Sequence, residues 1–505
     1  MALKICLTVF FALQALLAAP SARAASAPDT LRIGVYSLPP LSIAPFRSYS
    51  TPSIYFASAL YDALTEIAPG GVPIPALAVK WEQRSPTTWR FHLRQNVTFS
   101  NGEKFDAQSV AFALNHLMKP ENRGLPAANL AASLAGIVVV DAYTVDITAK
   151  RSAAALPNDM AGIYMPAPAA YQSMPEAEFA RAPIGTGPYR ITAKDAASVT
   201  LEAAPASWRP AKTKHIIFRM IADESARVAA MQTDAIDISI PVSPDRFEDV
   251  TAIGGRILEV PSASVFAIQL ITERPGSPFK DVRVRRAMNY AINKDAIAKS
   301  LFAGRTPTSG QAASVITAGF DPAIPAYPYD PAKAKALLAE AGFPNGFKVQ
   351  FDVVTSAIPA DAAMFTLVAR DLAAVGVAAE IQATNLTAWA KKHNGNDFEG
   401  LGFQMGFIAQ PQMNTVRAIL PFLCRSPASP VYTCVKELEP LVDAVESAPT
   451  LERRHELERA LNRAASDQAL AIFLIDGIDF TALSKNVVDA YAPTRFYHWE
   501  RFAKR

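Results

Sequence analysis

The chain has 505 residues, of which 50% are apolar, and its 49 basic and 46 acidic residues leave a formal net charge of +3. This near-neutral balance gives no strongly basic surface for nucleic acid or an anionic membrane to recognise. The length exceeds what one hydrophobic core usually organises, so we expect two or three lobes.

Residues 1–24 have the pattern of a secretory signal peptide. Lys4 precedes a short apolar stretch, and small residues stand at Ala22 and Ala24, just before the expected cleavage position. The apolar stretch is too short for a lasting membrane span, which needs about 20 residues. The sequence therefore predicts export of the protein, with cleavage near Ala24.

The chain that follows alternates between strand and helix patterns. Residues 88–93 alternate apolar and polar side chains, as a half-buried strand does, and Asp106 then precedes a helical stripe over 110–117. Residues 218–240 predict a strand, a helix and a second strand in quick succession.

The second half continues this alternation. Asp281 and Asp295 are expected to cap two helices, and Asp330 followed by Pro331 opens a third. The later segments predict a helix, glycine turn and strand at 365–384, a charged amphipathic helix at 450–467 and a buried strand at 469–476. This order, without an internal repeat or a low-complexity linker, predicts an α/β fold whose lobes share a chain that crosses between them.

The stretch APIGTGPYRI at 182–191 admits two interpretations. A dinucleotide-binding loop needs a third glycine where Arg190 stands and a helix directly after it, and Pro188 has no N–H to offer a phosphate. We therefore interpret Gly185 and Gly187 as positions where two backbone segments approach closely before a new strand.

Six blocks, in order along the chain, resemble the family-5 extracellular solute-binding proteins, the peptide, nickel and opine class that serves ABC importers. The blocks are 74–114 with its Trp81, 183–191, 207–238, 277–298, 329–343 and 480–502. The resemblance implies a large, type II-like periplasmic binding protein fold, in which two lobes close around a ligand by hinge motion. It also implies an extra subdomain inserted in the N-terminal lobe.

The implied domain boundaries are discontinuous along the chain. We place lobe I at 30–55, 183–268 and 478–505, the inserted subdomain at 56–182 and lobe II at 269–477. The chain is then expected to cross between the lobes near Ile268–Glu273 and again near Phe480.

The resemblance implies a monomeric periplasmic protein that needs no cofactor and binds no nucleic acid. It would hand a peptide-like or other small organic ligand to an ABC permease in the inner membrane. A second interpretation keeps the fold with a hydrophobic or sugar-like ligand, and a third is a secreted hydrolase. The six histidines show no metal-ligand spacing, and no Gly-x-Ser-x-Gly motif occurs, which speaks against the hydrolase.

The segment 400–414 departs from the family pattern. Peptide-binding members carry an aspartate, four residues before a proline, that pairs with the peptide's amino terminus. Phe407, or Gly406 if the register shifts by one, stands there, and no acidic residue occurs from 400 to 414. Because an unpaired buried ammonium costs several kcal/mol, we expect a ligand without an essential free amine.

The same segment supplies the first candidate ligand contacts: Gln404, Met405, Phe407 and Gln410. Its apolar residues alternate, which is equally typical of a strand with one face in the core, and both interpretations stay open. Phe266 and Gln269 could face the cleft or lie buried in the strand between the lobes. Trp389 could stack on a ligand or on its own helix.

A loop near the start of the chain offers Phe46, Arg47 and Tyr49. Arg47 could bind a carboxylate or phosphate through its guanidinium, or remain a solvated loop charge. Finally, Cys424 and Cys434 are ten residues apart in a protein expected to be exported, which predicts a local disulfide rather than a zinc site.

Overall fold

The computed structural model describes residues 29–38, 43–47, 51–355, 360–408, 413–424 and 432–505. The predicted signal peptide therefore lies outside the described residues. None of the helices within these ranges is both long and apolar enough to cross a membrane.

One mixed sheet of ten strands, counted over the described residues, runs through the molecule in the order β14, β13, β15, β12, β16, β11, β1, β10, β9, β8. Their bounds are β1 Thr30–Val35, β8 Tyr189–Lys194, β9 Ser198–Ala203, β10 His215–Met220, β11 Ile238–Ile240, β12 Arg256–Leu270, β13 Phe347–Val354, β14 Val377–Thr384, β15 Leu401–Ile408 and β16 Ala471–Leu483. The predicted α/β fold is confirmed.

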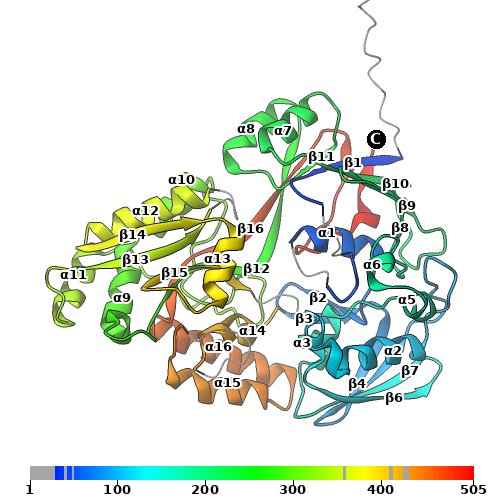
Figure 1. Ribbon diagram of the computed structural model, residues 1–505, viewed down its shortest axis with the longest axis horizontal. Helices are drawn as coiled ribbons and strands as arrows, with labels where there is room; N and C mark the ends of the chain where they lie inside the picture. Colours follow the sequence, from blue (N-terminus) through cyan, green and yellow to red (C-terminus); the bar gives the residue numbers. More distant parts are fainter. Residues whose placement is uncertain (1–28, 39–42, 48–50, 356–359, 409–412, 425–431) are drawn as a thin grey trace, which may run out of the picture.

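The fold has two lobes joined by the long strands β12 and β16 (Figure 1). At one end β13, β14 and β15 run parallel to one another, and at the other end β1 is parallel to both β10 and β11. Strands β12 and β16 pair antiparallel from Arg256 opposite Leu483 to Gln269 opposite Ala471, with the register interrupted between Pro261 and Val265. All residues of the predicted strand 469–476 are buried.

A separate four-stranded antiparallel sheet lies between residues 78 and 149, in the order β4, β5, β7, β6. Its strands are β4 Ala78–Ser85, β5 Thr88–Leu93, β6 Leu134–Asp141 and β7 Thr144–Ala149. The predicted alternation is confirmed, because Phe91 and Leu93 are buried while His92 between them is partly exposed. Two short pairs complete the strands: β2 Thr65–Ala68 with β3 Val72–Pro75, and β17 Val487–Asp489 with β18 Ala503–Lys504.

The α-helices have the bounds α1 Thr51–Leu60, α2 Ala107–Met118, α3 Ala128–Ala131, α4 Leu156–Asp159, α5 Pro168–Ser173, α6 Glu176–Phe179, α7 Glu224–Gln232, α8 Phe247–Ala252, α9 Val282–Ala291, α10 Lys294–Leu301, α11 Pro331–Glu340, α12 Asp361–Ala373, α13 Leu386–Asn394, α14 Thr415–Ile419, α15 Glu439–Glu446 and α16 Leu451–Asp467. Asp106, Asp281 and Asp330 cap α2, α9 and α11 as predicted. The cap assigned to Asp295 is wrong. Asn293 accepts the N–H of Ala296, and Asp295 lies in the first turn of α10.

Gly185 and Gly187 mark a close backbone crossing, as predicted. A Cβ atom at Gly185 would lie 2.1 Å from the carbonyl oxygen of Leu60, and one at Gly187 would lie 2.4 Å from the carbonyl carbon of the same residue. The N–H of Gly187 donates to that oxygen at 3.1 Å. Glycine is needed here because any side chain would separate α1 from the segment that leads into β8.

Three large hydrophobic clusters, and a small fourth one around Ile271, Phe398 and Tyr432, hold the described part of the chain together. The first packs β1, β8, β9 and β10 with α1, α2 and the four-stranded sheet, and the second packs β13 with α9, α10 and α12. The third joins Ile67 and Ala161 to Ile316, Met413 and Val416 from the other side of the molecule. This third cluster brings distant parts of the chain together at the site described next.

Candidate functional site

A hollow that we call the central cavity lies where the end of α1, strand β2 and the C-terminal segment meet Met413. Its empty volume is about 560 Å³, with the open solvent at its mouth included. Tyr61, Tyr164, Phe496 and Tyr497 provide most of its aromatic surface. The cavity therefore combines apolar walls with a few charged groups, the usual composition of a ligand site.

His498 is the central charged group of this cavity. Its Nε2 lies 2.8 Å from a Glu66 oxygen and its Nδ1 lies 3.1 Å from a Glu500 oxygen. Burial alone lowers the pKa of His498, but the hydrogen bonds to Glu500 and Glu66 outweigh it and raise the pKa to about 9. His498 is thus a cation near neutral pH and is not a general base.

Arg209 extends the same network. Its guanidinium lies 2.7 Å from Asp62 and 3.0 Å from Glu500, and both partners are buried. Asp62 also accepts hydrogen bonds from Thr186 at 2.8 Å and from the Trp208 indole at 2.9 Å. The charges at this wall are paired with one another, so the surface left for a ligand is largely aromatic and sulfur-containing.

Direct contacts close the molecule beside the central cavity. The N–H of Gly70, in the turn between β2 and β3, donates to the carbonyl oxygen of Ile316 at 2.7 Å. Ala318 lies against Gly71 and donates its own N–H to Met413 at 2.8 Å. A hairpin near residue 70 and a loop near residue 316 therefore form a backbone contact that leaves no room for a side chain at Gly71.

Phe46 and Arg47, predicted from the early loop, lie away from this cavity. Phe46 is fully buried and stacks on His116 at a centroid distance of 5.2 Å. Arg47 is about half exposed and forms an ion pair with Glu176 at 2.9 Å. Tyr49 lies outside the described residues. Ligand contact by these three residues stays a prediction.

Phe266 and Gln269 lie in β12 with 5% and 1% exposed surface. Phe266 packs in the cluster around β13 and α12, so its burial agrees with the second interpretation given above. Of the candidates in 404–410, Gln404 and Phe407 have their backbones opposite Ala267 and Val265 in the β12–β15 pair, and Met405 lies in the same strand. Their side chains and all of Gln410 lie outside what the structure describes, and their contact with a ligand stays a prediction.

Trp389 belongs to an aromatic group at the edge of this lobe. Its ring stacks on His393 at 5.1 Å within α13 and lies 5.7 Å from Phe398. Its indole nitrogen is buried and donates no hydrogen bond to any described residue. Trp389 therefore packs on its own helix, as in the second interpretation given above. Its stacking on a ligand stays a prediction.

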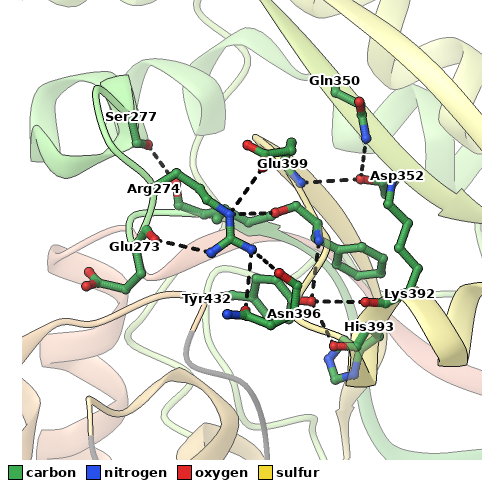
Figure 2. Close-up of polar contacts among 12 residues, drawn as sticks. Glu273, Arg274, Ser277, Gln350, Asp352, Lys392, His393, Asn396, Glu399 and Tyr432 are labelled. Carbon is green, nitrogen blue, oxygen red and sulfur yellow. Dashed lines mark hydrogen bonds and ion pairs between the residues drawn. The ribbon is translucent and has the colours of Figure 1, made fainter.

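Arg274 fixes the segment around this group (Figure 2). Its guanidinium donates to the carbonyl oxygens of Phe398 at 3.0 Å, Glu273 at 3.2 Å and Asn396 at 2.5 Å, and pairs with Glu399 at 3.5 Å. Lys392 pairs with the buried Asp352 on the neighbouring strand. These contacts attach the end of α13 to β13 and β15.

The predicted disulfide between Cys424 and Cys434 is confirmed. Tyr432, close to the second cysteine, donates its hydroxyl to the carbonyl oxygen of His393 at 2.7 Å, and its own carbonyl oxygen accepts the N–H of Thr272 at 2.8 Å. The disulfide therefore closes a loop whose end is attached to α13 and to the segment after β12.

Sequence reasoning missed most of the central cavity. The run RFYHWERF at 495–502 lies in a block that resembles the family, but nothing local marked His498 as a buried cation. Glu66 and Tyr164 have no local signal at all, because their role depends on contacts with residues hundreds of positions away. Among the described residues, no group of three or more His, Cys, Asp or Glu is arranged to hold a metal ion.

Residues 72–419 match the family described as bacterial extracellular solute-binding proteins, family 5 middle. The chain is similar to the glutathione-binding protein GsiB of Pectobacterium atrosepticum, with 32% identity over 313 residues that cover 61% of this chain and 60% of that protein. The alignment thus spans less than two thirds of the relative.

Solved structures with the same fold include HbpA2 from Haemophilus parasuis, with a TM-score of 0.79, 22% identity and coverage of 94% of this chain and 100% of that one. A dipeptide-binding protein from Pseudoalteromonas sp. SM9913 in complex with Met-Leu gives a TM-score of 0.78, 20% identity and the same coverage. At these identities the similarity establishes the fold, which is that of a two-lobed periplasmic binding protein.

Proposed function

The chain belongs to the bacterial extracellular solute-binding proteins of family 5, and we propose that it is the periplasmic solute-binding component of an ABC importer. It captures a peptide-like or other small organic solute between its lobes and delivers it to a membrane permease. The observation that carries this proposal is the family match across 72–419 on a fold whose lobes are joined by β12 and β16.

The transport step depends on closure of the lobes. The register of the β12–β16 pair shifts between Pro261 and Val265 and again between Phe266 and Ala267. We place the hinge at the first of these shifts, a few residues before the crossing expected from the sequence. A solute that contacts both lobes stabilises the closed state by its higher affinity for that state. The permease then recognises the closed form.

The proposed domains follow the ranges given by the resemblance. Lobe I comprises 30–55, 183–268 and 478–505, the subdomain 56–182 and lobe II 269–477. The four-stranded sheet supports this division because all of its strands lie within 56–182. The subdomain contacts lobe II through Gly70 and Gly71, so closure involves three parts of the chain.

The solute class is drawn from the site and from the relatives. The charged groups of the central cavity are already paired with one another. This supports a solute that needs no ion pair for a free amine, as expected from the lack of acidic residues in segment 400–414. The relative named as glutathione-binding and the neighbour bound to Met-Leu support a peptide-like solute. The aromatic cavity wall also suits a hydrophobic or sugar-like solute, which is the second candidate.

We propose that the protein binds without catalysis and acts as an exported monomer. The family supplies substrate-binding proteins to transporters, and His498 in the cavity is held protonated by two carboxylates.

The test is to purify the exported protein gently, denature it, and identify the released molecule by mass spectrometry. Small-angle scattering of the solute-free protein, before and after that molecule is added back, should show a smaller radius of gyration with the solute. Unchanged scattering with a solute that binds, or turnover of that solute, contradicts the proposal.

A further inference from the structure

A second hollow, which we call the lateral channel, lies between the inserted subdomain and the helices α14, α15 and α16. One wall is formed by residues 129–133, 149–156 and Asp159, and the other by α14, the end of α15 and Arg454. Its empty volume is about 1470 Å³, open solvent included. The walls touch where the hydroxyl of Ser152 donates to the carbonyl oxygen of Ala448 at 3.4 Å.

Four cations line the lateral channel, and three of them have a near partner. Arg454 lies 3.2 Å from the buried Glu458, and Arg151 lies 3.9 Å from Glu446. The ammonium of Lys150 donates to the carbonyl oxygen of Ala132 at 2.8 Å. These groups are therefore neutralised or hydrogen-bonded without any solute.

Arg417 is different. Across the described residues its guanidinium makes no hydrogen bond and no ion pair within 4.0 Å, and the carboxylate that attracts it is that of Asp159 on the opposite wall. The surrounding protein desolvates the guanidinium and lowers its pKa, although the side chain remains exposed to the water of the channel. A cation in this situation gains by binding an anion.

The backbone that carries Arg417 is fixed. Asn414 accepts the N–H of Arg417 at 2.9 Å as the cap of α14, and Val416 and Ile419 are buried in the cluster beneath the helix. Met413, one residue before this cap, lines the central cavity. Neighbouring residues of the chain thus line the channel and the central cavity.

We propose that Arg417 is the subsite for a carboxylate of the solute, which lies in the lateral channel between the inserted subdomain and α14. This inference rests on the proposed function and narrows it to an acidic solute. The planar guanidinium can donate two parallel hydrogen bonds to a carboxylate, which gives orientation as well as affinity.

The experiment compares an enzymatic casein hydrolysate with the same hydrolysate after methyl esterification, which removes its carboxylates. Thermal unfolding and calorimetric titration are measured with the full chain, the variant Arg417→Gln and the control Arg453→Gln. Arg453 is an exposed arginine of α16 that pairs with Glu456 and does not line the channel. Both substitutions remove one positive charge.

We expect the untreated hydrolysate to stabilise the wild type and Arg453→Gln, and the esterified hydrolysate to stabilise neither. Arg417→Gln should bind about ten- to a hundred-fold more weakly, the usual effect of losing a charge-assisted hydrogen-bond pair. Arg417→Lys keeps the charge but lacks the planar guanidinium, so its affinity should lie between those of the wild type and Arg417→Gln. It replaces the glutamine variant if that variant does not fold.

Equal stabilisation by both hydrolysates, or unchanged binding by the folded Arg417 variants, overturns the acidic subsite while leaving solute binding intact. No stabilisation of any form by either hydrolysate contradicts the proposed peptide-like solute itself. The two failures are therefore distinguishable.

Discussion

Replacing Gly71 with alanine should hold the two lobes apart. A Cβ atom at this position would lie 2.5 Å from Cβ of Ala318, 2.8 Å from the carbonyl oxygen of Met413 and 3.0 Å from the Ala318 nitrogen. Carbon atoms in contact normally lie about 3.5–4.0 Å apart, so Ala318 has to retreat by about 1 Å. That movement breaks the contact between the hairpin and the loop.

The expected magnitude follows from two costs. Gly71 has a φ of +73°, and a side chain in this left-handed region costs about 1–2 kcal/mol in the open and closed states alike. The steric clash exists only where Ala318 approaches, and such overpacking costs about 1–3 kcal/mol. Only the clash changes the closing equilibrium, so solute affinity should fall about 5- to 150-fold.

Gly70 provides a matched control. Its φ is +87° and no atom lies within 4 Å of a Cβ built there, so Gly70→Ala carries the same backbone cost without the clash. Both variants should therefore unfold at similar urea concentrations, below that of the wild type. Only Gly71→Ala should bind the released solute more weakly in calorimetry and keep a larger radius of gyration when the solute is added.

The reasoning is refuted if the folded Gly71→Ala variant closes and binds as the wild type does. It is equally refuted if Gly70→Ala loses as much affinity, because the loss then comes from backbone strain and not from the contact with Ala318.

Three further predictions concern stability and ligand choice. Burial raises the pKa of Glu458 to about 7 from 4.5, against the attraction of Arg454. The free energy of unfolding should therefore fall by up to about 3 kcal/mol as pH rises between these values, because the buried carboxyl has to ionise. Glu458→Gln should remove that part of the pH dependence in urea unfolding, and an equal difference between variant and wild type at pH 5 and pH 8 would contradict it. Replacing Cys424 and Cys434 with serine should cost about 2–3 kcal/mol because the loop between them is short; an unchanged urea midpoint of the wild type under reductant would argue against this. Phe407→Asp should gain binding of free-amine dipeptides by calorimetry, an expectation that fails if the unaltered protein already binds them tightly.

Much of the local structure was determined by the sequence itself. Asp106 and Asp281 cap helices because their short carboxylates reach the first free N–H groups, a contact that spans only a few residues. Gly185 and Gly187 were recognisable as a backbone crossing because Arg190, in place of a third glycine, and Pro188 exclude the competing phosphate loop. The Cys424–Cys434 bond was predictable because so short a loop closes easily. Ordered blocks along the chain indicated the family.

The site was decided by the tertiary structure. His498 becomes a buried cation only because Glu66, more than 400 positions earlier, lies 2.8 Å from it, and its own neighbours in the sequence do not encode that approach. Gly71 looks like an ordinary turn glycine until the fold places Ala318 against it. Arg417 resembles any helix arginine until the fold places it in a channel opposite Asp159. Local sequence patterns reflect contacts between residues a few positions apart. Desolvation and ion pairing at these positions depend instead on distant segments that only the folded chain brings together.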